Sequence, residues 1–277
     1  MNYQLTDINN PFDAPVFFVE SCGSTMDECR LLLKKSAQHG SVLLSGFQTN
    51  GYGRIKNRVW TSDNGKNLLF TVILRYSTFS DIPSAITLKS GLAVAAAILK
   101  TEPSLENCIK IKWPNDIMIN GKKVCGIVSE CDGKNVLLGI GINTAQTEFP
   151  FAPNATSLSI SLSMTCGKYP EQNMLLLKNV LNSLYYELQE SKEELQESKE
   201  SQNWNTRLNS ILFLKDEHVR FSAGAAEEKK VFWGTLKAVK ENGELEIICD
   251  NIVYSFASGE LSFDTAQTQH TPIEKPM

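Results

Sequence analysis

Short apolar runs and amphipathic helical segments alternate irregularly along this chain, and this pattern constrains its fold more than any other feature. Residues 16–19 and 68–74 have the length and composition of buried strands. Between such runs lie segments with helical spacing, but without the regular strand–helix–strand rhythm of a doubly wound fold. We therefore predict an α+β fold, in which helices flank a mixed β-sheet.

Three helices are predicted. Ser24 is the N-cap of the first, because Asp27 and Glu28 follow in the first turn; this helix is expected to end near His39. The second begins at Pro83, and four apolar residues at helical spacing predict its buried face: Leu88, Leu92, Ala96 and Leu99. The third runs from Tyr169 to about Ser201, with a stripe formed by Leu176, Val180, Leu184 and Leu188.

Further strands are predicted over residues 42–47, 109–112, 117–119, 124–128 and 136–143. Asn120-Gly121 predicts a tight hairpin between two of them. After residue 208 the pattern changes to short strands at 218–221, 231–239, 244–249 and 252–256, which indicates a small barrel. We predict a large domain over 1–209, a small one over 210–264, and a disordered polar tail over 265–277.

Residues 188–194 and 195–201 form a nearly identical seven-residue duplication. We interpret it as a solvated helix extension. The alternative, a coiled-coil partner site, is disfavoured because one apolar residue per heptad is too few for a seam.

Charge and cysteine usage exclude several classes of protein. A net charge of −4 and a pI near 5.6 give no electrostatic reason to expect a nucleic-acid partner. Seven cysteines without a C-x-x-C pair, and three scattered histidines, form no zinc pattern. Free thiols indicate a reducing compartment, and the N-terminus lacks the features of a targeting segment. The most apolar window, residues 91–99, is too short to span a bilayer. We expect a cytoplasmic protein without membrane contact.

A glycine-rich segment is the first candidate binding element. Gly51-Tyr-Gly-Arg54 is followed by Lys56, Arg58 and Trp60. Glycines permit close approach of a ligand, the cations suit a polyanion, and the indole offers a flat apolar face. A solvent-exposed basic turn before a core tryptophan is the alternative.

Three other segments are candidates. Lys112-Trp-Pro-Asn-Asp116 places a lysine at a strand end, where burial would require an anion nearby. Glycines in 123–130 and 139–143 mark close ligand approach, or simply tightly packed hairpins. Ser24-Thr25 reads as a helix cap or as polar ligands for a small molecule.

Together these segments, in this order and spacing, closely resemble the biotin–protein ligases (biotin–[acetyl-CoA-carboxylase] ligases). The resemblance covers residues 16–263, and Lys-Trp-Pro-Asn-Asp is its most specific element. It implies a biotin/lipoate ligase-like catalytic domain and a C-terminal SH3-like barrel. Only about 15 residues precede the first strand, so we expect the form without an N-terminal DNA-binding domain.

The resemblance implies that biotin is activated with Mg-ATP to biotinyl-5′-AMP. The biotinyl group is then transferred to a lysine of a biotin carboxyl carrier domain. The catalytic residues would be Lys112, Arg54 and Asp116. Biotin would be bound by Ser24, Thr25, Gln48, Gly51, Gly53, Arg54, Lys112, Gly126, Gly139 and Gly141. The nucleotide would be bound by Arg54, Arg58, Trp60, Asn115, Lys123 and Asn143, with the last of these reading the adenine edge.

Two assignments stay open at this point. Either Asn115 or Asp116 would hold Mg²⁺ or orient the incoming lysine. The protein is expected to be a monomer or a homodimer. Mg²⁺ is expected to enter with the ATP phosphates, and its protein ligands are not assigned.

The sequence departs from the family pattern at Met26, where a polar Asn is common, and at Tyr52, where Arg is common. One extra residue separates Arg54 from Trp60. A lipoate- or octanoate-transferring relative and a non-catalytic biotin-binding protein are the alternative functions. The Lys-Trp-Pro-Asn-Asp segment disfavours the first, and the retained cations disfavour the second.

Overall fold

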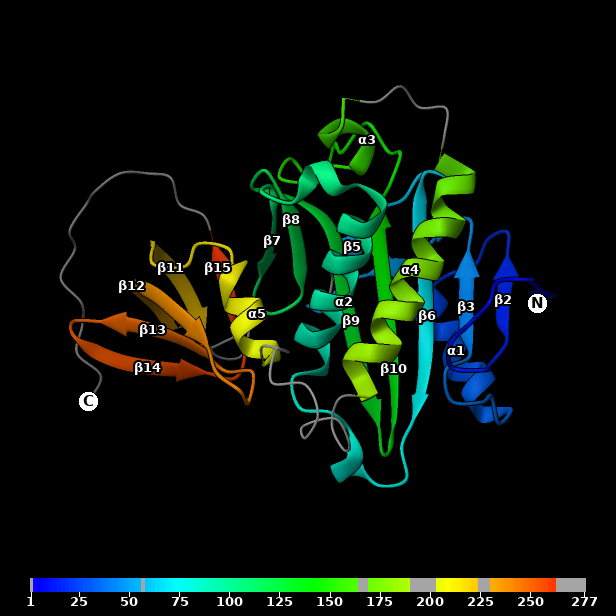
Figure 1. Cartoon of the computed structure of the whole chain (residues 1–277), viewed down its shortest axis with the longest axis horizontal. Coiled ribbons are helices and arrows are strands. Elements are labelled where there is room, and N and C mark those ends of the chain that lie inside the picture. Colours follow the sequence, from blue (N-terminus) through cyan, green and yellow to red (C-terminus); the bar gives the residue numbers. More distant parts are fainter. Residues whose placement is uncertain (1, 56–57, 164–168, 190–202, 224–229, 263–277) are drawn as a thin grey trace.

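An eight-stranded mixed sheet forms the centre of the molecule (Figure 1). The computed structural model describes residues 2–55, 58–163, 169–189, 203–223 and 230–262. The strand order is β1-β2-β3-β6-β10-β9-β8-β7, and only the β2–β3 pair is parallel among the described strands of this sheet. The strands are β1 (Gln4–Leu5), β2 (Val16–Val19), β3 (Val42–Ser45), β6 (Asn67–Arg75), β7 (Ile109–Lys112), β8 (Asp116–Ile119), β9 (Lys122–Asp132) and β10 (Asn135–Asn143). The predicted α+β class with a mixed sheet is confirmed.

Helices cover both faces of this sheet (Figure 1). On one face, α1 (Thr25–Lys34) buries Met26, Cys29 and Leu32 against Leu43 and other sheet residues. On the other face lie α2 (Ile86–Thr101) and α4 (Tyr169–Gln189). Because side chains alternate along a strand, the two helical layers contact alternate residues of the same strands.

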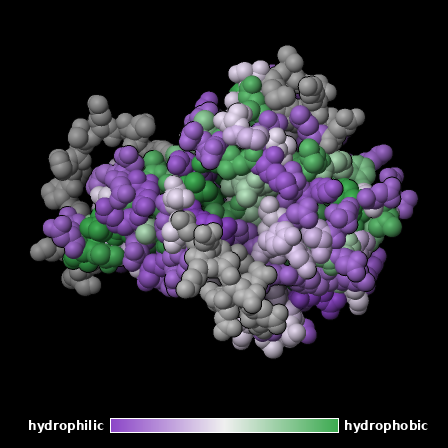
Figure 2. Space-filling view, viewed as in Figure 1, coloured by the Kyte–Doolittle hydropathy of each residue, from purple (hydrophilic) through white to green (hydrophobic). Residues whose placement is uncertain are grey.

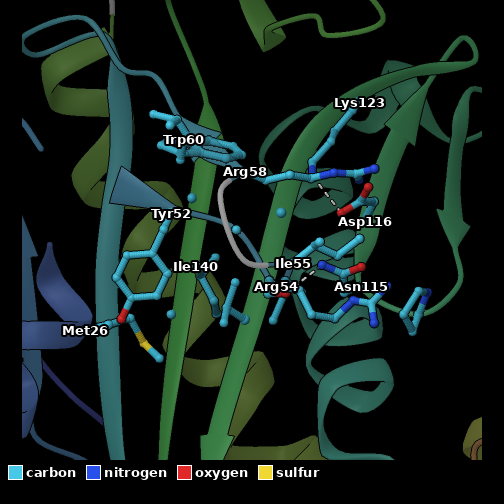
Figure 3. A pocket seen from close by; sticks show the side chains of 18 of the residues that line it. Met26, Tyr52, Arg54, Ile55, Arg58, Trp60, Asn115, Asp116, Lys123 and Ile140 are labelled. Atoms are coloured by element: carbon cyan, nitrogen blue, oxygen red, sulfur yellow. Dashed lines mark hydrogen bonds and ion pairs between the residues drawn. The ribbon is translucent and has the colours of Figure 1, made fainter. Parts of the chain in front are cut away.

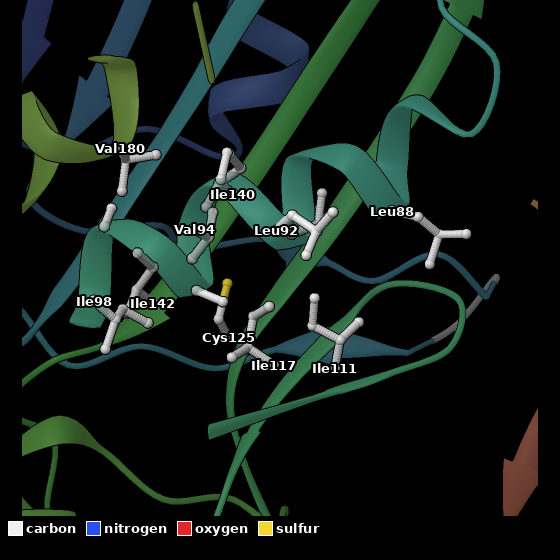
Figure 4. Packing of buried hydrophobic residues seen from close by; sticks show 14 of the residues in the cluster. Leu88, Leu92, Val94, Ile98, Ile111, Ile117, Cys125, Ile140, Ile142 and Val180 are labelled. Atoms are coloured by element: carbon white, nitrogen blue, oxygen red, sulfur yellow. The ribbon is translucent and has the colours of Figure 1, made fainter. Parts of the chain in front are cut away.

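The helix α2 is buried on nearly all sides, because α4 covers the face that the sheet does not. Its side chains Leu92, Val94 and Ile98 lie in a packed cluster with Ile117 and Ile142 of the sheet (Figure 4). Two expectations for this helix are wrong. It begins at Ile86 rather than Pro83, and Ala96 is exposed rather than part of a buried face.

The segment Phe79–Thr101, which includes α2, is long and apolar enough to cross a membrane by length and composition. Its most apolar window is 61% buried inside the protein. This segment is therefore accounted for as the central helix of the fold.

The other predicted boundaries shift modestly. The first helix ends at Lys34 rather than near His39, and β3 ends at Ser45. The Asn120-Gly121 turn is confirmed, with φ of 49° and 76° at its two residues. The third predicted helix corresponds to α4, which the structure describes only to Gln189. Most of the seven-residue duplication therefore lies outside the described residues.

The C-terminal region forms a separate five-stranded antiparallel sheet of order β14-β13-β12-β11-β15. Its strands are β11 (His218–Ala223), β12 (Lys230–Val239), β13 (Leu245–Cys249), β14 (Ile252–Phe256) and β15 (Glu260–Ser262). The last was not predicted. Within the described strands β14 does not pair with β15, so the expected closed barrel is instead an open sheet, consistent with an SH3-like domain.

A short helix, α5 (Trp204–Ser210), joins the two sheets by packing on both α2 and β12. Asn209 also exchanges two hydrogen bonds with the backbone of Val239.

The surface seen in Figure 2, in the same view as Figure 1, is mostly hydrophilic, with apolar side chains on the C-terminal sheet. Ile252 and Val253 of β14 are each 56% exposed. The division at residues 209 and 210 remains a prediction.

Candidate active site

One pocket collects almost all of the predicted site residues (Figure 3). It is formed by the start of α1, the hairpin of β4 (Gly51–Tyr52) and β5 (Val59–Trp60), the turn between β7 and β8, and the middle of β9 and β10. The C-terminal sheet contributes Glu260. Of the predicted site residues, Gly51 and Asn143 are not among those that line it.

These two residues have other roles. Gly51 pairs with Trp60, and a Cβ there would lie 2.9 Å from the Trp60 carbonyl oxygen, so the glycine permits the close hairpin. Asn143 is buried, accepts a hydrogen bond from Asn67 and donates one to the Thr156 carbonyl. Its amide therefore connects β10 to β6 and to the segment at Thr156, and its reading of an adenine edge stays a prediction.

The uncharged end of the pocket is built on the N-terminus of α1. Ser24 is the N-cap, as predicted, and its Oγ accepts from the backbone N–H of Met26 at 3.3 Å. Gln48 Oε1 accepts from the Thr25 backbone N–H at 2.7 Å and from its hydroxyl at 3.0 Å. Thr25 also accepts from the hydroxyl of Thr71 at 2.8 Å. Sequence reasoning missed Thr71, whose only signal is a lone hydroxyl in an apolar strand.

Two of the predicted glycines make room for side chains of this chain. A Cβ at Gly139 would lie 2.7 Å from the Met26 sulfur, and one at Gly141 would lie 2.9 Å from the Trp60 ring. The open cavity is about 160 Å³, below the several hundred Å³ usual for small-molecule sites. Met26 and Trp60 thus occupy space over the glycines that the resemblance assigned to a ligand.

Tyr52 connects the glycine-rich segment to α1 and β9. Its hydroxyl accepts from Arg30 at 2.9 Å, and Arg30 forms ion pairs with Asp27 and Glu130. Burial raises the pKa of Tyr52, so the phenol stays protonated. At the position where the family commonly has Arg, this chain therefore has a neutral group that is held by an arginine from another element.

Lys112 and Asp116 lie opposite each other across the hairpin of β7 and β8, with Trp113-Pro114-Asn115 as the turn. Directly opposite residues of an antiparallel pair point to the same face, which places both side chains at the pocket. Burial lowers the pKa of Lys112, and the carboxylates of Asp116 and Glu260 partly oppose that effect. The Trp113–Pro114 peptide bond is cis.

The remaining groups at this end form an ionic cluster (Figure 3). Lys123 Nζ lies 2.7 Å from Asp116 Oδ1 and 5.7 Å from the centre of the Trp60 ring. The indole Nε1 of Trp60 is buried without a hydrogen-bond partner among the described residues. Asn115 donates its amide to the Ile127 carbonyl at 2.9 Å and so anchors the turn to β9.

The C-terminal sheet contacts both predicted phosphate-binding arginines. Arg54 donates to the Gly259 carbonyl at 2.8 Å, and Arg58 forms an ion pair with Glu260. Burial lowers the pKa of Arg54, while Asp116 and Glu260 raise it. Sequence reasoning missed Glu260, because more than 200 residues separate it from its partner.

Comparison with known proteins shows what this chain is similar to. The model of the biotin/lipoate A/B protein ligase family matches residues 19–145. The bifunctional ligase/repressor BirA of Bacillus subtilis is 35% identical over 151 residues, which are 52% of this chain and 45% of that protein. The biotin–[acetyl-CoA-carboxylase] ligase of Mycobacterium tuberculosis is 35% identical over 125 residues, 43% of this chain and 45% of that protein. The matches to these curated relatives thus span less than half of their length.

Solved structures extend the likeness over both sheets. The biotin protein ligase of Aquifex aeolicus, in complex with biotin and ATP, has a TM-score of 0.71 and 26% identity. The comparison covers 89% of this chain and 97% of that one. The ligase of Leishmania major, at 23% identity and a TM-score of 0.56, shares the fold. The sheet order, the pocket and these matches agree: residues 19–145 match the model of the biotin/lipoate A/B protein ligase family, and the fold is that of solved biotin protein ligases.

Proposed function

We propose that this protein is a biotin–protein ligase, which activates biotin with ATP and transfers it to a lysine of a biotin carboxyl carrier domain. The observation that carries this proposal is a single pocket with two chemically different ends. Neutral hydroxyl and amide groups of Ser24, Thr25 and Gln48 lie at one end. Lys112, Arg54, Arg58 and Lys123 lie at the other. A bicyclic urea with a carboxylate tail, joined to a nucleotide phosphate, has this same division.

In the first step, a biotin carboxylate oxygen attacks the α-phosphorus of ATP, and the bond to pyrophosphate breaks. Both reactants are anions, so they repel each other until cations are placed between them. Lys112, one of the cations at the charged end, would stabilise the charge that develops on the α-phosphate oxygens. Arg54 and Arg58 would bind phosphate oxygens once they leave Gly259 and Glu260, and Trp60 would pack against the adenylate.

Magnesium would accompany the ATP. The part of the chain that the structure describes has no group of three or more His, Cys, Asp or Glu side chains suited to a metal. Mg²⁺ is commonly held by one or two carboxylates together with substrate phosphates and water, so such a cage is not needed. Asp116 fits this role, because its Oδ1 is buried and has an ion pair but no hydrogen-bond donor. The ion would supply charge neutralisation at the phosphates. With its amide nitrogen bonded to Ile127, Asn115 is assigned to the turn.

In the second step, the amine of the carrier lysine attacks the carbonyl carbon of the mixed anhydride. An amide bond forms, AMP leaves with the C–O electron pair, and the amine loses a proton. A biotin carboxyl carrier domain is the proposed partner because the Mycobacterium tuberculosis relative is named for an acetyl-CoA carboxylase. We place the reaction in the cytoplasm, where free thiols such as those of Cys22, Cys29 and Cys125 persist.

Incubation with labelled biotin, Mg-ATP and a carrier domain tests the proposal. We expect biotinyl-AMP without the carrier and a labelled carrier lysine with it. Parallel reactions with lipoate and octanoate test the alternative acyl substrates. Label on neither adenylate nor carrier, or preferential transfer of lipoate or octanoate, would contradict the proposal.

A further inference from the structure

A hydroxyl outside the pocket controls the chemistry of the pocket wall. Thr71 lies in the middle of β6 and is fully buried. Its hydroxyl bonds to that of Thr25 at 2.8 Å, and Thr25 in turn bonds to Gln48 Oε1 at 3.0 Å. The backbone N–H of Thr25 contacts the same Gln48 oxygen at 2.7 Å. These bonds form a continuous relay from the interior of the sheet to the pocket.

The direction of every bond in this relay follows from one group that cannot reverse. A backbone N–H only donates, so the Gln48 atom beside it must be the carbonyl oxygen of the side-chain amide. A carbonyl oxygen only accepts, so the Thr25 hydroxyl must give it its single proton. Thr25 then accepts from Thr71, and the Thr71 hydroxyl must be the donor.

This assignment defines what the wall offers a ligand. The amide nitrogen of Gln48 is left as a donor, since its oxygen is already bonded twice. The Thr25 oxygen keeps one lone pair as an acceptor. Ser24 Oγ accepts from Met26, and no hydrogen bond between described residues uses the Ser24 hydroxyl proton, which remains a donor. Donors beside one acceptor complement a carbonyl that adjoins an N–H, as in a cyclic urea.

We propose that Thr71 is a positioning residue that sets this polarity, so that Thr25 presents an acceptor to an N–H of the biotin urea. The inference rests on the proposed function, because it takes the urea of biotin as the ligand. Without the Thr71 donor, the Thr25 oxygen has an unsatisfied buried lone pair. Its side chain is then free to turn away from the ligand N–H.

Replacement of Thr71 by three residues of similar size tests the proposal. Thr71→Val keeps the shape but removes the donor, and we expect the Kd for biotin, measured by calorimetry without ATP, to rise about five- to tenfold. Thr71→Ser restores the donor and should restore the Kd. Thr71→Cys, a weak donor, should raise it about threefold and serves if the valine variant does not fold. The rate of pyrophosphate release at saturating biotin should stay within about twofold of the unmodified rate, because the relay does not reach the phosphates.

Thr144→Val is the matched control. Thr144 is also fully buried and donates its hydroxyl to the Lys66 carbonyl at 3.0 Å, outside the pocket. This variant should leave the Kd unchanged. Desthiobiotin, which keeps the cyclic urea but lacks the sulfur ring, should lose affinity for Thr71→Val by the same factor as biotin.

The outcomes separate the two proposals. An unchanged Kd in Thr71→Val, a loss confined to biotin but absent for desthiobiotin, or a fall in saturated rate without a change in Kd would each overturn the role of Thr71. If the unmodified protein itself binds no biotin, the proposed function fails, and the inference fails with it.

Discussion

The two ends of the pocket differ in the partners that their side chains bind within the protein itself. At the uncharged end, Thr25 of α1, Thr71 of β6 and Gln48 of the loop after β3 are connected to one another by short hydrogen bonds. At the charged end, Arg54 and Arg58 are bound to Gly259 and Glu260 of a different sheet. Under the proposed function, the first set would receive biotin without exchanging partners, whereas the second would release protein groups before binding phosphate.

This difference has a physical origin. Neutral hydrogen bonds between buried groups are satisfied inside the protein and cost little to maintain. Arginines near the surface need an anion, and in the protein without ligand Glu260 is the anion that Arg58 contacts. If the proposed function is correct, biotin binding would depend mainly on a preformed wall, while nucleotide binding would depend on exchange of ionic partners.

The largest effect is expected from loss of the Lys112 charge at the cationic end of the pocket. Lys112→Ala should lower the rate of pyrophosphate release by about 100-fold or more, because its charge acts mainly in the transition state. Biotin should still bind, although more weakly. Lys110→Ala, on the same strand but outside the pocket, is the control. Pyrophosphate release near the unmodified rate would remove Lys112 from its catalytic role.

A smaller effect is expected at the charged end of the pocket, from loss of an arginine. Arg54→Gly should speed escape of biotinyl-AMP about tenfold while slowing its synthesis less, because charge-assisted hydrogen bonds to phosphate hold the intermediate. Labelling of bystander lysines measures the escape. Arg58→Gly provides the comparison. If only this second variant leaks, the holding residue is Arg58, and if neither leaks, the arginines do not retain the intermediate.

The pH dependence of pyrophosphate release tests the role of the Lys112 charge. Burial lowers the pKa of Lys112, so the required ammonium loses its proton at a lower pH than an exposed lysine near 10.4. Pyrophosphate release should therefore be constant below this lowered pKa and fall above it, by up to tenfold per pH unit. Lys112→Arg should be slower but should lack this alkaline fall, since guanidinium stays charged. An identical fall in both proteins would assign the titration to another group.

The smallest effect is expected from the competing carboxylate. Glu260→Gln removes the anion beside Arg58, and the KM for ATP should fall about two- to threefold, the modest effect usual for partly exposed ion pairs. Glu244→Gln, which breaks the pair with Lys240 elsewhere on the C-terminal sheet, should not change it. A higher KM in Glu260→Gln would show that the carboxylate orients Arg58 for phosphate.

Several features could be predicted because their signals are local. The Ser24 cap, the Asn120-Gly121 turn and the end of the strand at Lys112 each depend on residues a few positions apart. Boundaries were less accurate where tertiary packing decides them. The face of α2 is one example, because α4 covers the side that an isolated amphipathic helix would expose.

By itself, the sequence determined the α+β class, the order of the binding segments and most residues of the pocket. Those properties follow from hydrophobic periodicity, turn chemistry and the pattern shared with a family. Only the tertiary structure decided that Thr71 donates to Thr25, that Asn67 donates to Asn143, and that Glu260 contacts Arg58. Each of these contacts joins residues that are far apart in the chain. Their geometry depends on how strands and sheets pack, and neither spacing nor composition encodes it locally.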